Sequence, residues 1–258
     1  MIEMFKEVYH YRELLKNNVK KEIRGRYKNS ILGVFWTFLN PLLQILVYAT
    51  IFPLILKNAQ EYYVIFVCVG LIPWTYFTTS ISQSTFTVVG NGNIVKKVYF
   101  PREILPISIV LSNTVNFLIS TIIIIAFCLI YGLGITKYIL YFPLILLVQL
   151  VLQLGLGFIL SAVTVYFRDL EHFIGITLQL MFYATPIVYA ENSIPQSFKW
   201  IMRYNPMAAI LEGYRDIFYN QHAPDLLRLE KWFGVSLILF VIGWMIFNKL
   251  QKGFSEEL

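Results

Sequence analysis

Six long apolar runs, separated by short islands of charged residues, dominate the pattern of hydrophobic and polar positions along this chain. No Asp or Glu lies inside any of them. A helix needs about 20 apolar residues to cross roughly 30 Å of hydrocarbon, so five runs are long enough and the last one suffices with its flanks. We therefore predict six transmembrane helices, in the runs 29–56, 62–95, 104–136, 138–167, 172–190 and 232–248.

The composition also favours an all-α membrane protein. Hydrophobic residues make up 57% of the chain and charged residues 14%, a departure from soluble averages that is typical of polytopic membrane proteins. The soluble alternative, six fully buried core helices in 258 residues, would leave too little chain to surround them. Trp232 and Trp244 fit interfacial positions in the last run.

The basic residues predict how the protein is oriented. Lys and Arg gather in the first 28 residues and after the second, fourth and last runs. The positive-inside rule then places both termini in the cytoplasm. This topology and contact with anionic lipid explain the net charge of +6, and no nucleic-acid motif occurs.

Residues 1–28 carry a predicted basic amphipathic helix, which leaves residues 29–258 as one six-helix membrane domain. Such a helix fits the cytoplasmic interface, with its lysines at lipid phosphates and its apolar stripe in the acyl boundary. A plain topological anchor is the alternative. The stripe recurs every three or four positions, at Val8, Tyr11, Leu15, Val19, Ile23 and Tyr27.

Polar and aromatic side chains repeat every four residues on several predicted spans. Polar groups in hydrocarbon need partners, so these stripes should face other helices or a hydrated path rather than lipid. Packing between helices is one interpretation, and a conduit for a sugar chain is the other. The candidate channel-lining residues are Trp36, Asn40, Gln44, Tyr48, Gln179, Phe182 and Tyr183. Further stripes comprise Ser108, Ser112, Asn116 and Ser120, and Gln149 with Gln153.

The segment 192–221, between the last two runs, is too rich in proline and charge to cross a membrane. A break at Asn205 and Pro206 predicts two short helices, because proline disfavours helix at the preceding residue and is accepted in a first turn. We expect this pair to lie at the outer face, partly re-entrant, where it could lid an exit. An amphipathic surface hairpin is the alternative. The candidate outer-gate residues are Asn205, Pro206, Glu212 and Arg215.

The sequence contains no recognisable catalytic chemistry. The three histidines lack metal-ligand spacing, the two cysteines lack paired spacing, and no glycine-rich phosphate loop ends in Gly-Lys-Ser/Thr. No carboxylate lies within a run, where a proton-driven carrier would need one. A membrane enzyme is therefore disfavoured, and we expect a chain that binds no metal or cofactor and does not hydrolyse ATP itself. If it pumps, a partner supplies the energy.

Four segments, in the same order along the chain, resemble type-2 ABC export permeases. The first is Arg-Tyr-Lys-Asn-Ser-Ile-Leu-Gly at 26–33, followed by Trp36 and Pro41. The most specific is Asn-Ile-Val-Lys-Lys-Val-Tyr-Phe-Pro-Arg-Glu-Ile-Leu-Pro at 93–106, which is similar to a connection in permeases that export O-antigen, capsule or teichoic acid. The others are Tyr-Phe-Arg-Asp-Leu at 166–170 with Thr-Pro-Ile at 185–187, and Asn-Pro-Met at 205–207 with Glu-Gly-Tyr-Arg at 212–215.

The resemblance implies a homodimeric permease of the bacterial cytoplasmic (inner) membrane that moves lipid-linked polysaccharide outward. Two separate ATP-binding cassette subunits would bind the ATP and Mg²⁺. A closed two-fold pair also encloses a glycan-sized conduit better than six helices alone. The implied ATPase-coupling residues are Val98, Tyr99, Phe100, Pro101, Arg102, Arg168 and Asp169. The implied contacts to lipid pyrophosphate are Arg24, Arg26 and Lys28.

Other functions stay open at this point. The same architecture could carry a small drug or a lipid, and an ATP-independent channel or scaffold would simply lack the ATPase partner. A membrane glycosyltransferase is disfavoured because its acids are missing. The candidate coupling residues could equally be topological charge, and the N-terminal basic residues could serve ordinary lipid contact.

Overall fold

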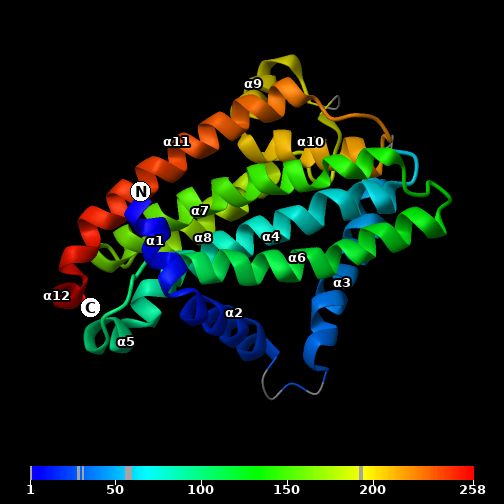
Figure 1. Cartoon of the computed structure of the whole chain (residues 1–258). Coiled ribbons are helices and arrows are strands. Elements are labelled where there is room, and N and C mark those ends of the chain that lie inside the picture. Colours follow the sequence, from blue (N-terminus) through cyan, green and yellow to red (C-terminus); the bar gives the residue numbers. More distant parts are fainter. Residues whose placement is uncertain (1, 28–29, 31, 56–59, 192–193) are drawn as a thin grey trace.

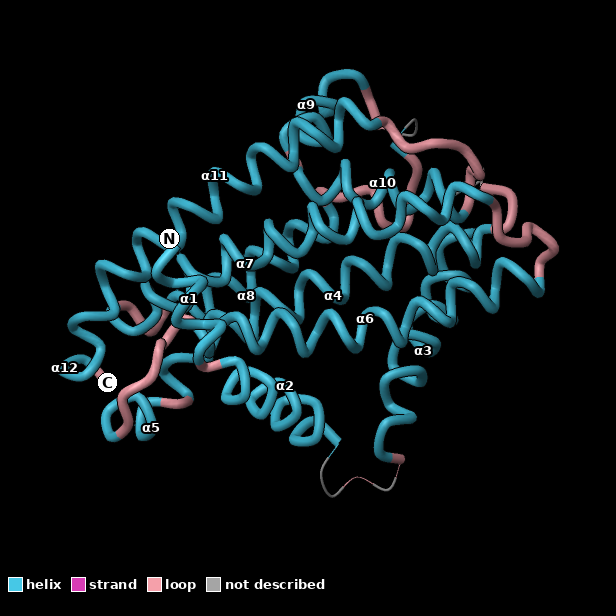
Figure 2. The backbone as a smooth tube through the Cα atoms, viewed as in Figure 1, coloured by secondary structure: helices cyan, strands magenta, loops and turns pink. Residues whose placement is uncertain are grey.

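A computed structural model describes residues 2–27, 30, 32–55, 60–191 and 194–258. Within these ranges all regular secondary structure is helical, as predicted (Figure 1). The connections gather mostly at the two ends of a bundle of long helices (Figure 2). The α-helices are α1 (Ile2–His10), α2 (Arg12–Tyr27), α3 (Trp36–Ile55), α4 (Tyr63–Gly90), α5 (Gly92–Lys97), α6 (Ile104–Ile130), α7 (Phe142–Tyr166), α8 (Leu170–Tyr183), α9 (Lys199–Tyr204), α10 (Pro206–Phe218), α11 (Leu226–Leu250) and α12 (Phe254–Glu257).

Five of the described helices are long and apolar enough to cross a membrane, namely α3, α4, α6, α7 with its preceding turn, and α11. They correspond to five of the six predicted spans. The run 172–190 contains most of α8, which has 14 residues and is too short to cross by itself. Pro186 accounts for its early end, because proline disfavours the helical conformation at the residue before it. A sixth spanning helix is therefore not confirmed.

Helix α4 forms the centre of the bundle. It packs along α6 and α7, and it also contacts α3, α8 and α10. The outer flank of α7 is covered by α11, and the two helices cross closely at Gly155 and Gly243. A Cβ on either glycine would meet the backbone of the other helix. Small residues permit this close approach, so the α7–α11 contact depends on them.

A second hydrophobic cluster, which we call the basal cluster, lies apart from the main core. It occupies the end of the bundle where α5, α12 and both chain termini meet (Figure 1). Residues from six helices and one connection build it, so it joins segments that are far apart in the sequence. Its buried members are Val88, Val95, Phe100, Leu105, Phe158, Ala162, Val165, Phe247 and Phe254.

The basic N-terminal segment forms two helices, α1 and α2, that meet at Tyr11, instead of the single helix predicted. Helix α2 packs along α6. Tyr11 and Leu14 pack, partly buried, against the basal cluster, and Lys21 Nζ donates a hydrogen bond of 3.3 Å to Asn91 Oδ1. The N-terminal helices are therefore basic and also packed against the bundle.

The break predicted at Asn205 and Pro206 is present between α9 and α10. Pro206 occupies the first turn of α10, and the Asn205 side chain caps it by accepting hydrogen bonds from the backbone of Met207 (2.9 Å) and Ala208 (3.4 Å). Helix α9 is exposed, with Trp200 61% accessible, whereas α10 is almost entirely buried against α4 and α7. The alternative of a surface hairpin is therefore wrong for α10.

Candidate functional site

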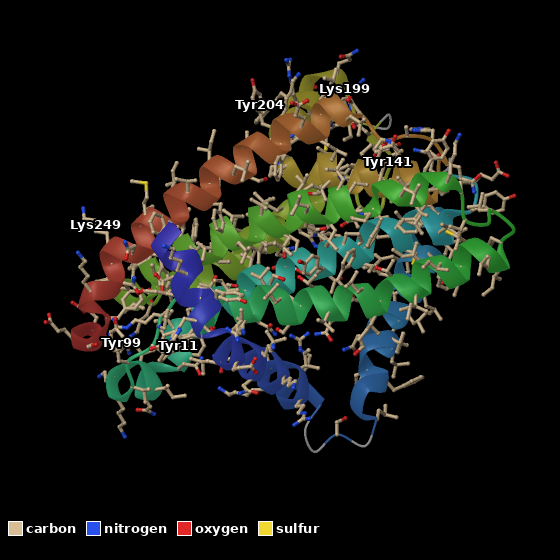
Figure 3. The ribbon with its side chains drawn as sticks, in the orientation of Figure 1. Tyr11, Tyr99, Tyr141, Lys199, Tyr204 and Lys249 are labelled. Atoms are coloured by element: carbon tan, nitrogen blue, oxygen red, sulfur yellow. The ribbon has the colours of Figure 1, made fainter. Side chains whose placement is uncertain are left out.

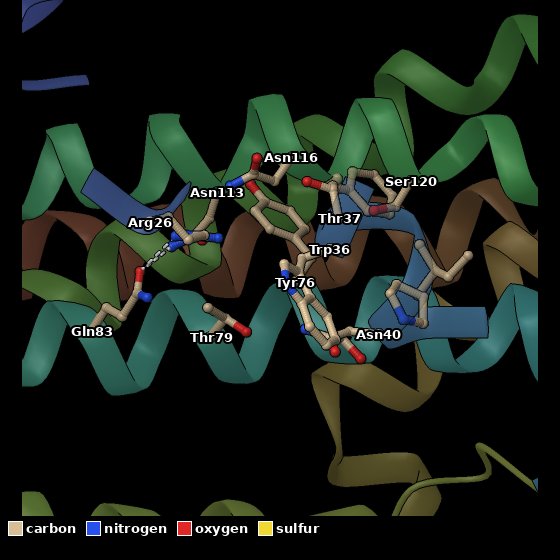
Figure 4. A pocket seen from close by; sticks show the side chains of 14 residues that line it. Arg26, Trp36, Thr37, Asn40, Tyr76, Thr79, Gln83, Asn113, Asn116 and Ser120 are labelled. Carbon is tan, nitrogen blue, oxygen red and sulfur yellow. Dashed lines mark hydrogen bonds between the residues drawn. The ribbon is translucent and has the colours of Figure 1, made fainter. Parts of the chain in front are cut away.

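A groove of about 390 Å³ with a mixed polar and apolar lining lies between the C-terminal end of α2, the start of α3, and the middle of α4 and α6 (Figure 4). Amides, hydroxyls, aromatic rings and the Arg26 guanidinium line it together with Pro41 and Ile72, and none of the described lining residues carries a carboxylate. Among the described residues, no group of three His, Cys, Asp or Glu side chains could hold a metal ion. The groove thus offers neutral hydrogen-bonding groups beside aromatic faces.

Arg26 stands at one end of this groove, where two amides orient its guanidinium. Its Nη2 donates to Asn113 Oδ1 at 2.8 Å and to Gln83 Oε1 at 3.1 Å. Asn113 Nδ2 in turn donates to Gln83 Oε1 at 3.0 Å, so the three side chains form a closed triangle across α2, α4 and α6. Charge-assisted bonds of this kind fix a guanidinium in direction as well as place.

The other predicted pyrophosphate contacts do not join this triangle. Arg24 lies on α2 with an exposed side chain. Lys28 falls outside the residues that the structure describes. Of the two that the structure describes, Arg26 lines the groove.

Five of the seven predicted channel-lining residues are not among the described residues that line the groove, and three of these five are exposed on their helices. Trp36 and Asn40 line the groove from α3. Tyr48 continues the same face of α3 and meets Phe182 of α8, with ring centroids 5.6 Å apart, and Trp74 flanks Phe182 at 6.1 Å. The exposed residues are Gln44, Gln179 and Tyr183.

Several groove residues were missed by the sequence analysis. On α4 they are Thr75, Thr79 and Gln83, which share the four-residue spacing that marked the other stripes and could have been found by it. Asn113 lies off the predicted α6 stripe, but it is three residues before Asn116 and so shares its helix face. These four missed residues lie where the polar faces of α4 and α6 meet the groove.

Other polar stripes serve packing between or within helices. Ser108 and Ser112 bond to carbonyls three residues earlier, at 2.8 and 2.9 Å. Gln149 on α7 is fully buried and donates to the Pro73 carbonyl on α4 at 2.9 Å. Gln153 is also fully buried, and neither of its side-chain polar atoms has a hydrogen-bond partner among the described residues. The Gln149 bond therefore supports the packing interpretation, whereas Gln153 is buried without such a bond.

The predicted coupling residues 98–102 form the connection between α5 and α6 at the basal end, near the exposed α7–α8 turn that holds Arg168 and Asp169. Tyr99 is 89% accessible and projects at that end (Figure 3), while the adjacent Phe100 is buried in the basal cluster. Arg102 does not project alone, because its guanidinium bonds to Ser255 Oγ at 2.9 Å and to the Gln251 carbonyl.

The predicted gate residues fasten α10 to the segment after α8. Asn205 Nδ2 donates to Thr185 Oγ1 at 2.8 Å, and Arg215 Nη2 donates to the Ile187 carbonyl at 2.8 Å. Arg215 is fully buried, with its guanidinium 3.8 Å from the ring centre of Phe66. Glu212 lies 3.7 Å from the same guanidinium. Burial raises the pKa of the Glu212 carboxyl, and Arg215 partly opposes that rise.

Comparison with known proteins places these features in context. The family model of ABC-2 type transporters matches residues 13–219. The chain is 36% identical over 247 residues, and 37% identical over 250 residues, to two proteins of Klebsiella pneumoniae called O-antigen export system permease protein RfbA, with 95% of each chain covered. It is 36% identical to the protein of that name from Myxococcus xanthus, over the whole of both chains.

Proposed function

Because this chain belongs to the ABC-2 type transporter family, as the four sequence segments predicted, we propose that it is the membrane subunit of an ATP-driven exporter. Its cargo is a lipid-linked polysaccharide, carried outward across the bacterial inner membrane. The names of the three relatives support this cargo, since each is an O-antigen export permease. Two copies of the chain and two separate ATP-binding subunits make up the exporter, and ATP and Mg²⁺ bind on the latter.

The observation that carries the proposal is the composition of the groove. A glycan presents many hydroxyls together with the C–H faces of its rings, so neutral hydrogen-bonding groups and aromatic faces suit a path for it. Trp36 and Tyr76 supply such faces, and Asn40 and Asn116 supply amides, with no carboxylate among the described lining residues.

We assign the pyrophosphate of the carrier lipid, which lies next to the first sugar, to the Arg26 end of the groove. A pyrophosphate is recognised best by an oriented guanidinium, and Gln83 and Asn113 orient this one from two different helices. The glycan then extends from Arg26 past Trp36 towards Tyr48 and Phe182. This direction leads from α2 along α3 to α8.

The proposed topology has six crossings with both termini in the cytoplasm. Helix α8 and the segment up to Ala190 together make the fifth crossing, with its helical part covering only one side of the bilayer. Helix α10, which begins at Pro206, then re-enters from the outer face. This re-entry accounts for its almost complete burial. Asn205 and Arg215 hold the outer half of the fifth crossing closed at rest.

The ATPase subunit transmits the effect of ATP hydrolysis to the membrane subunit through the basal end. The exposed Tyr99, and the turn at Arg168 and Asp169, supply the surface that the ATPase subunit contacts. An aromatic side chain that is 89% accessible at a loop tip fits a cleft in a partner.

Purification of the tagged chain from its native membrane in mild detergent tests the proposal. We expect an ATP-binding subunit in equimolar amount, and Mg²⁺-dependent ATP hydrolysis that Tyr99→Ala lowers by about tenfold while the chain still folds. The matched control is Tyr9→Ala, because Tyr9 is an exposed tyrosine on α1. A chain that repeatedly purifies alone would support an ATP-independent channel or scaffold instead.

A further inference from the structure

The C-terminal segment 251–258 folds back onto the connection that carries Tyr99. It comprises a short 3-10 turn, Gln251–Gly253, and the four-residue helix α12. Helix α12 contacts α5 as well as α7, and it lies beside α5 in Figure 1. The last helix of the membrane bundle is thereby linked to the loop between the second and third spans.

An aromatic anchor holds this segment in place. Phe254 is fully buried in the basal cluster, with its ring centre 5.6 Å from Phe247 and 6.3 Å from Tyr166. Phe100, one residue after Tyr99, is a member of the same cluster. The base of the Tyr99 loop and the C-terminal segment therefore share one hydrophobic contact region.

Polar contacts join the same two segments directly. Besides its bonds to Ser255 and the Gln251 carbonyl, Arg102 places its guanidinium 5.7 Å from the ring centre of Phe254. Gln251 Nε2 donates to Glu103 Oε1 at 3.0 Å. The two charged residues that end the coupling connection thus both bind the C-terminal segment. Arg102 is therefore engaged within the chain rather than pointing outward as a docking contact.

We propose that residues 251–258 are a positioning element, which holds Val98 and Tyr99 in the orientation that the ATPase subunit requires. This inference rests on the proposed function, since it assigns a role in coupling to a partner. The side chains of Val98 and Tyr99 are 57% and 89% accessible, and the Val98 backbone N–H donates a hydrogen bond of 2.9 Å to the Ile94 carbonyl of α5. Their orientation is determined by Phe100 and Arg102, and those two residues are held by Phe254 and Ser255.

The test uses the complete exporter, reconstituted in vesicles of phosphatidylethanolamine and phosphatidylglycerol. Phe254→Ala removes the anchor and is expected to lower maximal ATP hydrolysis by about fivefold or more. The thermal unfolding midpoint should fall as well, because a fully buried ring is lost. Ser255→Ala removes only the side-chain bond to Arg102, and about a twofold loss is expected. Glu257→Ala is the matched control in the same helix, because Glu257 is exposed, and it should hydrolyse ATP like the wild type.

A reversible cross-link separates positioning from simple destabilisation. A Cβ on Gly92 would lie 3.7 Å from Leu258 Cβ, within the range that a disulfide spans. Gly92→Cys with Leu258→Cys, added to Phe254→Ala, should restore ATP hydrolysis when the two thiols are oxidised to a disulfide, and dithiothreitol should abolish the recovery. The native Cys68 and Cys128 are both buried and remain in place.

The outcomes distinguish the two proposals. If wild-type complex hydrolyses ATP and Phe254→Ala matches it, or if the formed disulfide gives no recovery, the positioning role is wrong and the exporter stands. If Phe254→Ala fails to fold, full activity of Ser255→Ala together with Gln251→Ala overturns the role in the same way. If no ATP-binding subunit accompanies the wild-type chain, the proposed function itself fails.

Discussion

Helices α3 and α4 are both charge-free and both apolar enough to cross a membrane, yet their surroundings differ sharply. In the most apolar stretch of α4, 78% of the residues are buried inside the protein, against 17% in α3. Helix α4 lies among α6, α7 and α10, whereas much of α3 extends away from the bundle, below α6 in the view (Figure 1). Overall apolarity therefore says that a helix belongs in a membrane, but not whether protein or another environment covers it.

The polar side chains of the two regions differ in the same way. Those between α4 and α7 are sealed in the bundle, as Gln149 and Gln153 show. Those of α3 remain accessible, with Trp36 37% exposed and Asn40 at the groove. A buried polar group stabilises or strains a helix contact, while an accessible one can bind a passing ligand. The α3 flank is thus the region that we assign to transport.

The largest expected effect comes from disturbing the packed region at Gly70. A Cβ there would lie 2.8 Å from the Ile187 carbonyl oxygen and 3.0 Å from Arg215 Nη2. Gly70→Ala should therefore destabilise the protein by roughly 1–3 kcal/mol and lower its yield and its thermal unfolding midpoint. Gly175→Ala is the control, because α8 leaves open space around that position. Equal stability of both variants would contradict the tight contact.

A smaller effect on stability, but a large one on transport, is expected from the α3 flank. Trp36→Ala, Asn40→Ala and Tyr48→Ala together should lower export by about tenfold while the unfolding midpoint shifts by only a few degrees. Export is measured as surface polysaccharide labelled on intact cells, relative to the total in lysed cells.

The control for this triple variant replaces exposed apolar residues of the same helix, Leu43, Leu46 and Leu54, by alanine. It should export at close to the wild-type rate. Arg26→Ala alone should also lower export, because Arg26 lies at the other end of the groove. Unchanged export in the triple variant and in Arg26→Ala would exclude this groove as the path.

The smallest effect is predicted for Gln153→Leu, inside the packed region. The Gln153 amide is fully buried without a hydrogen-bond partner among the described residues, so an apolar side chain of similar size should be neutral or stabilise by about 1 kcal/mol. Export should stay at the wild-type level. A clear loss of export, with stability retained, would mean that the α4–α7 contact takes part in transport after all.

Particular residues explain why the sequence predicted the fold better than the site. The break at Asn205 and Pro206 was predictable, because capping and proline geometry are local. The position of Tyr99 in a connection between two helices was predictable from the segment 93–106. The closed triangle of Arg26, Gln83 and Asn113 was not, because it joins three helices whose relative rotation depends on packing.

The sequence by itself determined that this protein is helical and membrane-embedded and to which family it belongs, because apolar length and local motifs need no tertiary information. It did not locate the end of the helix within the run 172–190, at Tyr183, three residues before Pro186. Only the tertiary structure decided which polar stripe is sealed and which is accessible, and that the C-terminal segment supports the Tyr99 loop. Those properties arise from contacts between distant segments, and no local pattern specifies them.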